Sequence, residues 1–281
     1  MSEQTRRLET EDYTDPACPF CADAYLKNPP PLRTIDQGRV LEKLDEILSR
    51  ADTAGAERHL KYWLADAEDG RDLSGQFTLH GELAGLYRKS GREEESLAHA
   101  DAALRLADEL GIGDGLAGAT ALINKATALK AFGHAPDAVP LFERARAILE
   151  GARFRVPDKL AGLYNNMALA LSDVGRLDEA RHYFKKALDL LGEIDGSEPE
   201  RAVTWLNLAN LEEKESGLEA AEQKIAQYLE RARALLLKPG LAHDGNYAFV
   251  CEKCAPTFAY YGYFLDAKEL EERARAIYER T

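Results

Sequence analysis

An internal repeat with a period of 42 residues constrains the fold of this chain more than any other feature. Gly91, Gly133 and Gly175 follow one another at this interval, and each is followed twelve residues later by an alanine: Ala103, Ala145 and Ala187. Three related segments, ERARAIL, ERARALL and ERARAIY, recur at 143–149, 230–236 and 272–278. Because a unit of this length cannot bury its own apolar face, the units must stack into a solenoid that shares one core.

Each unit has the pattern of two amphipathic helices joined by a short turn. Between residues 160 and 191, apolar residues recur every three or four positions on both sides of Gly175, as on two helical stripes. Glycine suits the left-handed turn between such helices. Clusters of Gly, Pro and Asp separate the units. The first helix is expected from Asp36 and is followed by its partner, and five further helix pairs are expected at 74–111, 114–151, 157–192, 198–238 and 244–280.

The interval between glycine and alanine changes in the fifth unit and is kept in the first unit. In the fifth unit, Gly217 and Ala232 are fifteen residues apart, which predicts about three extra residues in its turn or its second helix. In the first unit, Gly55 and Ala67 keep the interval of twelve, which makes Gly55 the expected counterpart of the turn glycines.

Other positions repeat relative to the turn glycine, and they support a resemblance to a family. A small residue lies seven before it (Ala84, Ala126, Ala168), and a large apolar residue lies four before it (Tyr87, Leu129, Leu171). With the segment WLNLA at 205–209, this pattern resembles the tetratricopeptide repeat. The period exceeds the usual 34 residues, and this longer form is similar to the repeats of kinesin light chains and of bacterial peptide-sensing regulators. The resemblance covers about 245 residues from Ile35 onward. It implies an all-α, right-handed superhelical solenoid of about six antiparallel helix pairs.

Residues 1–34 differ in kind from the solenoid expected at 35–281. This segment contains the motif CPFC at 18–21 and three consecutive prolines at 29–31. Consecutive prolines favour an extended polyproline conformation and exclude helix. We therefore expect an N-terminal tail followed by the repeat array.

Composition excludes several classes of function. The net charge of −13 argues against a nucleic-acid partner, because phosphate neutralisation requires a basic surface. No apolar run is long enough to cross a membrane, and the N-terminus lacks the apolar core of a secretory signal, so a cytoplasmic protein is expected. No nucleotide-binding, serine-hydrolase or zinc-protease motif is present, so we expect a non-enzyme.

The candidate site is a column of asparagines on the first helices, which are expected to line the concave side of the solenoid. Nine residues before the turn glycine lie Asn124 and Asn166, and the segment WLNLA places Asn207 at the same position in the fifth unit. An asparagine amide both donates and accepts, so a ladder of asparagines can bond the backbone of an extended peptide. In tetratricopeptide proteins that bind peptides, this groove-facing position commonly holds asparagine.

Further residues of the same helices are expected to add contacts to a peptide: Asn165, Asn210, Lys130, Arg88 and Lys253. The alternative for the asparagines is a hydrogen bond to a neighbouring helix, which would serve the fold rather than a ligand.

The cysteines suggest a second function. Cys18 with Cys21 and Cys251 with Cys254 form two CxxC pairs, a spacing typical of zinc sites. The last pair, however, falls on inward-facing positions, where cysteine packs as a small apolar residue. The 15 residues from Cys21 to Asp36 span at most about 50 Å. A four-cysteine site therefore requires the tail to run back along the groove, the superhelix to close, or a head-to-tail homodimer.

These observations predict a non-enzymatic scaffold that binds a protein or an extended peptide in the groove of the solenoid. The alternative is a zinc- or thiol-dependent regulatory protein. Zinc is the one cofactor that the sequence suggests, and neither nucleic acid nor membrane is expected as a partner.

Overall fold

The computed structural model describes residues 30–50, 52–153 and 156–279, and this part of the chain forms twelve α-helices and no strand. The helices form six antiparallel pairs: α2 (Gln37–Ser49) with α3 (Thr53–Asp69), α4 (Leu73–Lys89) with α5 (Glu93–Glu109), α6 (Leu116–Ala131) with α7 (Ala135–Glu150), α8 (Pro157–Asp173) with α9 (Leu177–Gly192), α10 (Glu198–Ser216) with α11 (Leu218–Leu236), and α12 (Gly245–Tyr260) with α13 (Phe264–Tyr278). The predicted all-α class and the predicted helix pairs are confirmed. Most of the predicted tail, including CPFC, lies outside the described residues.

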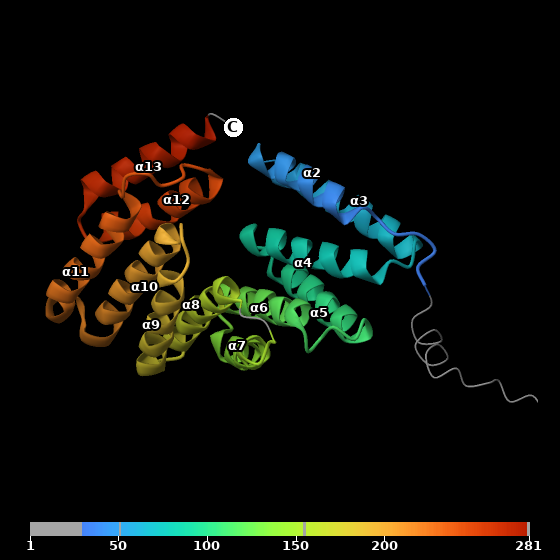
Figure 1. Ribbon diagram of the computed structural model, residues 1–281, viewed down its shortest axis with the longest axis horizontal. Coiled ribbons are helices and arrows are strands. Elements are labelled where there is room, and N and C mark those ends of the chain that lie inside the picture. The colour runs from blue at the N-terminus through green and yellow to red at the C-terminus, as the bar shows by residue number, and fades with distance from the viewer. Residues whose placement is uncertain (1–29, 51, 154–155, 280–281) are drawn as a thin grey trace, which may run out of the picture.

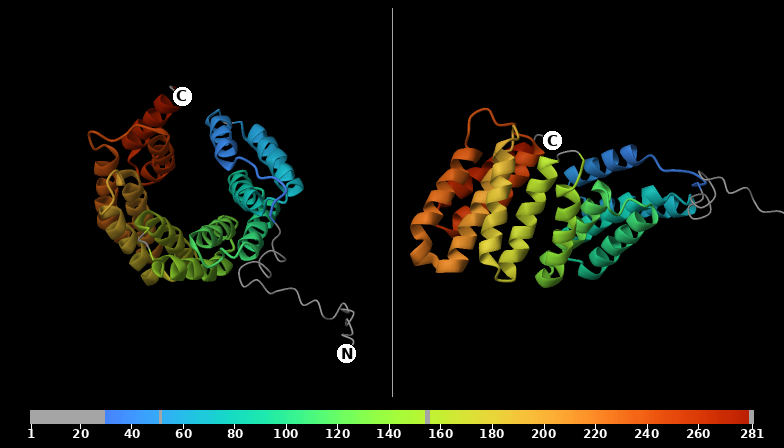
Figure 2. Two further views of the ribbon diagram at one scale, coloured as in Figure 1. Left: turned by 45° about the vertical axis from the view of Figure 1, so that its right-hand side comes forward. Right: turned by 60° about the horizontal axis from the view of Figure 1, so that its bottom comes forward.

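The six pairs stack side by side along a C-shaped course (Figure 1). The first helices of the pairs lie on the inside of the curve and the second helices on the outside, and the two ends of the solenoid face each other across the opening (Figure 2). The first helices of successive pairs approach one another, as α4 does with α6 and α10 with α12. The concave side is therefore a wall built from first helices.

Glycine in the left-handed conformation closes the turns inside the regular pairs. Gly175 has φ +81°, its N–H donates to the carbonyl of Ser172, and the next N–H, of Arg176, donates to Leu171. These bonds satisfy carbonyls at the end of α8.

The first pair turns without such a glycine, so the expected role of Gly55 is wrong. Asp52 caps α3 instead, because its carboxylate accepts from the Gly55 N–H at 2.7 Å. Gly55 consequently lies in the first turn of that helix. An aspartate at the N-cap can begin a helix without help from a preceding turn glycine.

In the fifth pair the extra residues lengthen the helices and not the turn. Gly217 alone, with φ +81° and ψ 160°, separates α10 from α11. Both helices have 19 residues, whereas those of the neighbouring pairs have 15 to 17.

Alanines occupy the positions where helices cross in the core. Ala126, Ala145, Ala168 and Ala187 are 0% exposed, and small side chains at such crossings let the helix backbones approach closely. Phe184, 1% exposed, belongs to the same apolar cluster as Ala126, Ala145 and Ala168. The repeating alanines of the sequence are thus the contact points of the solenoid.

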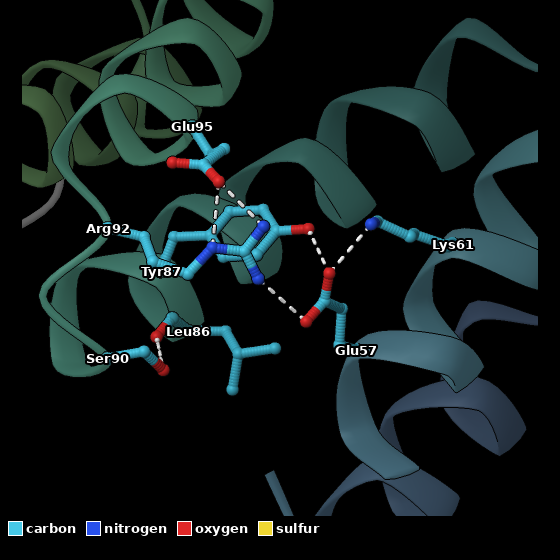
Figure 3. A network of polar contacts seen from close by, with 7 residues as sticks. All are labelled: Glu57, Lys61, Leu86, Tyr87, Ser90, Arg92 and Glu95. Carbon is cyan, nitrogen blue, oxygen red and sulfur yellow. Dashed lines mark hydrogen bonds and ion pairs between the residues drawn. The ribbon is translucent and has the colours of Figure 1, made fainter. Parts of the chain in front are cut away.

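A polar network joins the first pair to the second (Figure 3). The carboxylate of Glu57 on α3 accepts hydrogen bonds from Lys61 at 2.6 Å, Arg92 at 2.8 Å and the Tyr87 hydroxyl at 3.0 Å. Arg92 also bonds Glu95, and its guanidinium lies 4.3 Å from the centre of the Tyr87 ring. Tyr87 is 1% exposed, so this network satisfies the polar end of a buried aromatic side chain.

The variant Phe184→Ala is expected to lower the free energy of unfolding by about 3–5 kcal/mol, because it leaves a cavity in the core. Phe264→Ala is the matched control, since Phe264 is 69% exposed, and it should change stability by less than about 0.5 kcal/mol. Urea unfolding followed by circular dichroism measures both. Equal losses would contradict the packing described.

A pair of histidines makes stability depend on pH. The Nδ1 atoms of His80 on α4 and His99 on α5 lie 2.7 Å apart, so one ring donates to the other. Burial, His99 and Arg105 lower the pKa of His80 to about 4, and burial also lowers the pKa of His99. Both rings are therefore neutral in the folded protein at neutral pH.

Since the folded-state pKa of His80 lies below its ordinary value of 6.5, the unfolded chain takes up this proton first as the pH falls. The contribution to stability is expected to be complete above pH 6.5 and to be lost progressively between pH 6.5 and about 4. His80→Gln should flatten this part of a plot of melting temperature against pH. A variant profile that follows the wild type would show that the histidine pair is not responsible.

Candidate functional site: the concave side of the first helices

The concave surface of the solenoid is formed by the solvent-facing face of each first helix. On α6 this side carries Thr120, Asn124, Thr127 and Ala131, spaced by four, three and four residues, and all four are exposed or half-buried. The same spacing places Asn166 on the open side of α8. Asn207 occupies the equivalent position on α10. The column predicted from the sequence thus lies on three consecutive first helices.

The amides of this column have no hydrogen-bond partner among the residues that the structure describes. Asn124 is exposed, Asn166 and Asn207 are half-buried, and none of the three side chains makes a hydrogen bond to any residue that the structure describes. Each therefore presents one acceptor and two donor hydrogens without competition from the fold. We call Asn124, Asn166 and Asn207 the asparagine column.

Two other predicted asparagines are engaged in the fold. Asn165 on α8 donates from Nδ2 to the hydroxyl of Thr204 on α10 at 2.8 Å. Asn210 on α10 accepts a hydrogen bond of 3.0 Å from the hydroxyl of Tyr261. Both bonds link neighbouring pairs. These two asparagines therefore bond a neighbouring helix, as in the alternative that serves the fold rather than a ligand.

The predicted basic residues lie on the same side but are held differently. Lys130 lies 3.7 Å from the carboxylate of Asp173 on the next first helix. Lys253 is exposed on α12, and Arg88 is half-buried on α4. Burial lowers the pKa of Arg88, and no carboxylate among the described residues forms an ion pair with it. A half-buried guanidinium without a partner favours an anionic ligand.

A cleft of about 270 Å³ opens beside Arg88, where α2 does not approach α4 closely. Its walls combine apolar side chains with a few polar groups, and they include Leu44, Leu48, Glu82, Arg88, Asn124 and Thr127. Burial and the nearby Asp45 raise the pKa of Glu82, although this side chain remains accessible to solvent. Clefts of this mixed character are where ligand side chains typically insert.

Gly81 and Gly85 belong to the same cleft and were not singled out from the sequence. They lie one helical turn apart on α4, and a Cβ built on either would meet no atom within 4 Å. Glycine inside a helix costs about 1 kcal/mol relative to alanine, and neither position needs glycine for packing. They could have been noticed in the sequence, because glycine is unfavourable inside a helix and these two lie in the middle of a helical pattern.

The cysteine pair on α12 is part of the core. Cys251 and Cys254 are 0% and 1% exposed, in one apolar cluster with Tyr247 and Phe258. Burial raises the pKa of Cys254 to about 12 and also raises that of Cys251, so both are protonated thiols at neutral pH. Among the described residues, no three His, Cys, Asp or Glu side chains lie together as metal ligands would. Cys18 and Cys21 lie outside the described residues.

The thiols of Cys251 and Cys254 are therefore expected to be unreactive in the folded protein. In a Cys18→Ser/Cys21→Ser variant, a colorimetric disulfide reagent should label neither thiol within minutes at neutral pH, because the reactive thiolate is suppressed. Both thiols should react at once in denaturant. Fast labelling of the native variant would contradict their burial.

The family model of the tetratricopeptide repeat matches residues 76–151 and 159–234, which together make up more than half of the chain. The chain therefore belongs to the tetratricopeptide repeat family. Repeats of this family generally form protein-binding scaffolds and generally lack catalytic activity. None of the described helices combines the length and apolar character that a membrane crossing requires.

Several solved structures share this fold. BtubC from P. vanneervenii is 21% identical, with a TM-score of 0.54 over 82% of this chain and 90% of that chain. A Rap protein complexed with competence and sporulation factor is 16% identical, with a TM-score of 0.53 over 85% of this chain and 73% of that one. A variant of a putative kinesin light chain from Podosopora anserina is 21% identical, with a TM-score of 0.50 over 70% and 92%. At these identities the likeness concerns the fold. A comparison with curated proteins found no match.

Proposed function

We propose that this chain is a non-enzymatic scaffold that binds an extended peptide segment of a partner protein along its concave side. The observation that carries the proposal is the asparagine column: Asn124, Asn166 and Asn207 lie at equivalent positions on consecutive first helices and have no bonding partner in the described fold. Amides held in this way can bond the N–H and C=O groups of a peptide whatever its side chains are.

The spacing of the column supports an extended ligand. Packed helices lie about 8–10 Å apart, and an extended chain advances about 3.3–3.6 Å per residue. Each asparagine would therefore meet roughly every third residue of the peptide. The contrast with Asn165, whose amide joins α8 to α10, supports a role for the column outside the fold.

The cleft beside Arg88 would hold one anchoring side chain of the same peptide. The apolar wall formed by Leu44 and Leu48 would cover an aliphatic or aromatic side chain. The unpaired Arg88 would bond a neighbouring carboxylate of the ligand. Backbone bonds along the column would then give affinity, and the cleft would select the register.

The replacement of Asn124, Asn166 and Asn207 together by alanine tests the column. Peptides selected against the full chain from a random library would be titrated by fluorescence anisotropy. Each lost hydrogen bond costs about 1 kcal/mol, so the triple variant should bind at least about a hundredfold more weakly. Asn246→Ala serves as control, since Asn246 bonds Glu200 near the start of α12, and it should retain wild-type affinity. Undiminished binding by the triple variant would refute the proposal.

A second prediction concerns the cleft. Gly85→Leu should fill it and lower the affinity for the same peptides about tenfold or more, because the new side chain takes the place of the anchor. The fold should tolerate this change, since a Cβ at Gly85 meets nothing within 4 Å and leucine favours helix. The expected combination is a raised melting temperature with weakened binding. If affinity stays at the wild-type level, the cleft is not part of the site.

A further inference from the structure

The last two helix pairs meet in a way that differs from every other boundary in the described solenoid. At the other boundaries the second helix packs closely on the next first helix, as α7 does on α8 and α9 on α10. The helices α11 and α12 do not approach each other in this way. A cleft of about 520 Å³ opens between α11 and the turn that joins α12 to α13.

The two pairs are joined near the end of α11, where the hydroxyl of the buried Tyr247 donates to the carbonyl of Leu236 at 2.8 Å. Near the start of α11, Leu218 and Glu219 line the cleft together with Tyr261 and Tyr263 of the α12–α13 turn. Both tyrosines are partly buried and pack against the apolar cluster that the two pairs share.

One side of α11 forms a wall of the cleft. It carries Leu218, Glu222, Ile225 and Leu229, spaced by four, three and four residues, and the opposite wall is formed by tyrosines of the α12–α13 turn. This spacing is the side of a helix that normally packs on a neighbouring element. Here part of that side is open to solvent.

Two large apolar side chains that line the cleft are exposed and form its mouth. Leu218 is 52% exposed and Tyr260 is 66% exposed. Phe264 and Leu265, which directly follow the turn, are 69% and 85% exposed. Exposed apolar groups of this size in one neighbourhood are typical of an interaction surface.

The charge of the cleft is negative. Glu219 and Glu222 line it, and neither forms an ion pair with any described residue. Glu213, on the adjacent α10, accepts hydrogen bonds from the hydroxyls of Tyr260 and Tyr261 at 2.6 and 2.7 Å. Within the described part of the chain, no lysine or arginine lines the cleft. A ligand for this surface must combine apolar side chains with positive charge.

We propose that this cleft and its exposed mouth form a second docking surface, which binds a basic amphipathic segment of a partner protein. Apolar side chains of the segment enter between α11 and the α12–α13 turn and contact Leu218 and Tyr260. Its lysines or arginines meet Glu219 and Glu222. This surface does not include the asparagine column, so it can be occupied independently of the concave groove.

The probe for this surface is a fluorescent 14-residue peptide of leucine and lysine in a helical amphipathic order. Two control peptides are a scrambled order of the same residues and a version with glutamate in place of lysine. In anisotropy titrations with the full chain, the amphipathic basic peptide should bind at least tenfold more tightly than either control. Equal binding of the scrambled peptide would indicate attraction to the net charge alone and would overturn the proposal.

Variants separate the contribution of apolar contacts to peptide binding from that of charge. Leu218→Ser/Tyr260→Ser should weaken binding of the basic peptide about tenfold or more, whereas Leu116→Ser, at a side chain 40% exposed on α6, should leave it unchanged. Glu219→Gln/Glu222→Gln should also weaken binding and reduce its dependence on salt. Circular dichroism verifies that each variant remains helical.

Two results would overturn the proposal. The first is wild-type affinity in both double variants. The second is a dimer of the full chain, detected by light scattering, that Leu218→Ser/Tyr260→Ser dissociates, because the surface would then be covered by a second copy. A monomer whose affinity for the basic peptide depends on both pairs of residues supports it.

Discussion

The structure depends on the close approach of helices at buried alanines. A single pair of helices exposes two apolar stripes, and only a neighbouring pair can cover them. Ala126, Ala145, Ala168 and Ala187, all 0% exposed, allow that approach. A larger side chain at any of these fully buried positions would overpack the core and force neighbouring helices apart. The alanines that recur in the sequence are therefore also the buried contacts that recur along the solenoid.

In the part of the chain that the structure describes, the same packing leaves one side of each first helix uncovered. Since the second helices and the next pair cover the other sides, the concave wall has to be completed by solvent or by a ligand. Polar groups on this wall are either used to join neighbouring pairs, as Asn165 is with Thr204, or remain free, as in the asparagine column. The concave side carries both kinds within one helical turn of α8. Stability and binding capacity thus come from adjacent residues of the same helix.

Much of this fold could be predicted from the sequence because single residues mark the turns between its helices. Turn glycines such as Gly133 and Gly175 need the left-handed conformation, with φ +87° and +81°, and this requirement is visible in one residue. The prediction failed at Gly55, where the cap formed by Asp52 replaced a turn glycine. The extra residues of the fifth unit were expected in its turn or its second helix; the turn is short, and the second helix is long, as is the first, which was not expected.

The candidate site was less accessible to prediction. Asn165 and Asn166 are neighbours in sequence, and only the position of Thr204 on the next pair shows which amide is engaged. The two clefts arise from distances between helices, at α2 and α4 and at α11 and α12. Such distances depend on the sum of many side-chain contacts and are not encoded in a repeated motif. The burial of Cys251 and Cys254, in contrast, followed from their inward positions.

The most direct measurement of the central claim is the NMR signal of the asparagine side-chain amides in the full, isotopically labelled chain. A peptide selected for binding would be added stepwise. The account predicts that the amide signals of Asn124, Asn166 and Asn207 shift together and saturate at one peptide concentration, while that of Asn165 stays in place because it is bonded to Thr204. Saturable binding that leaves the three signals unmoved would contradict the account.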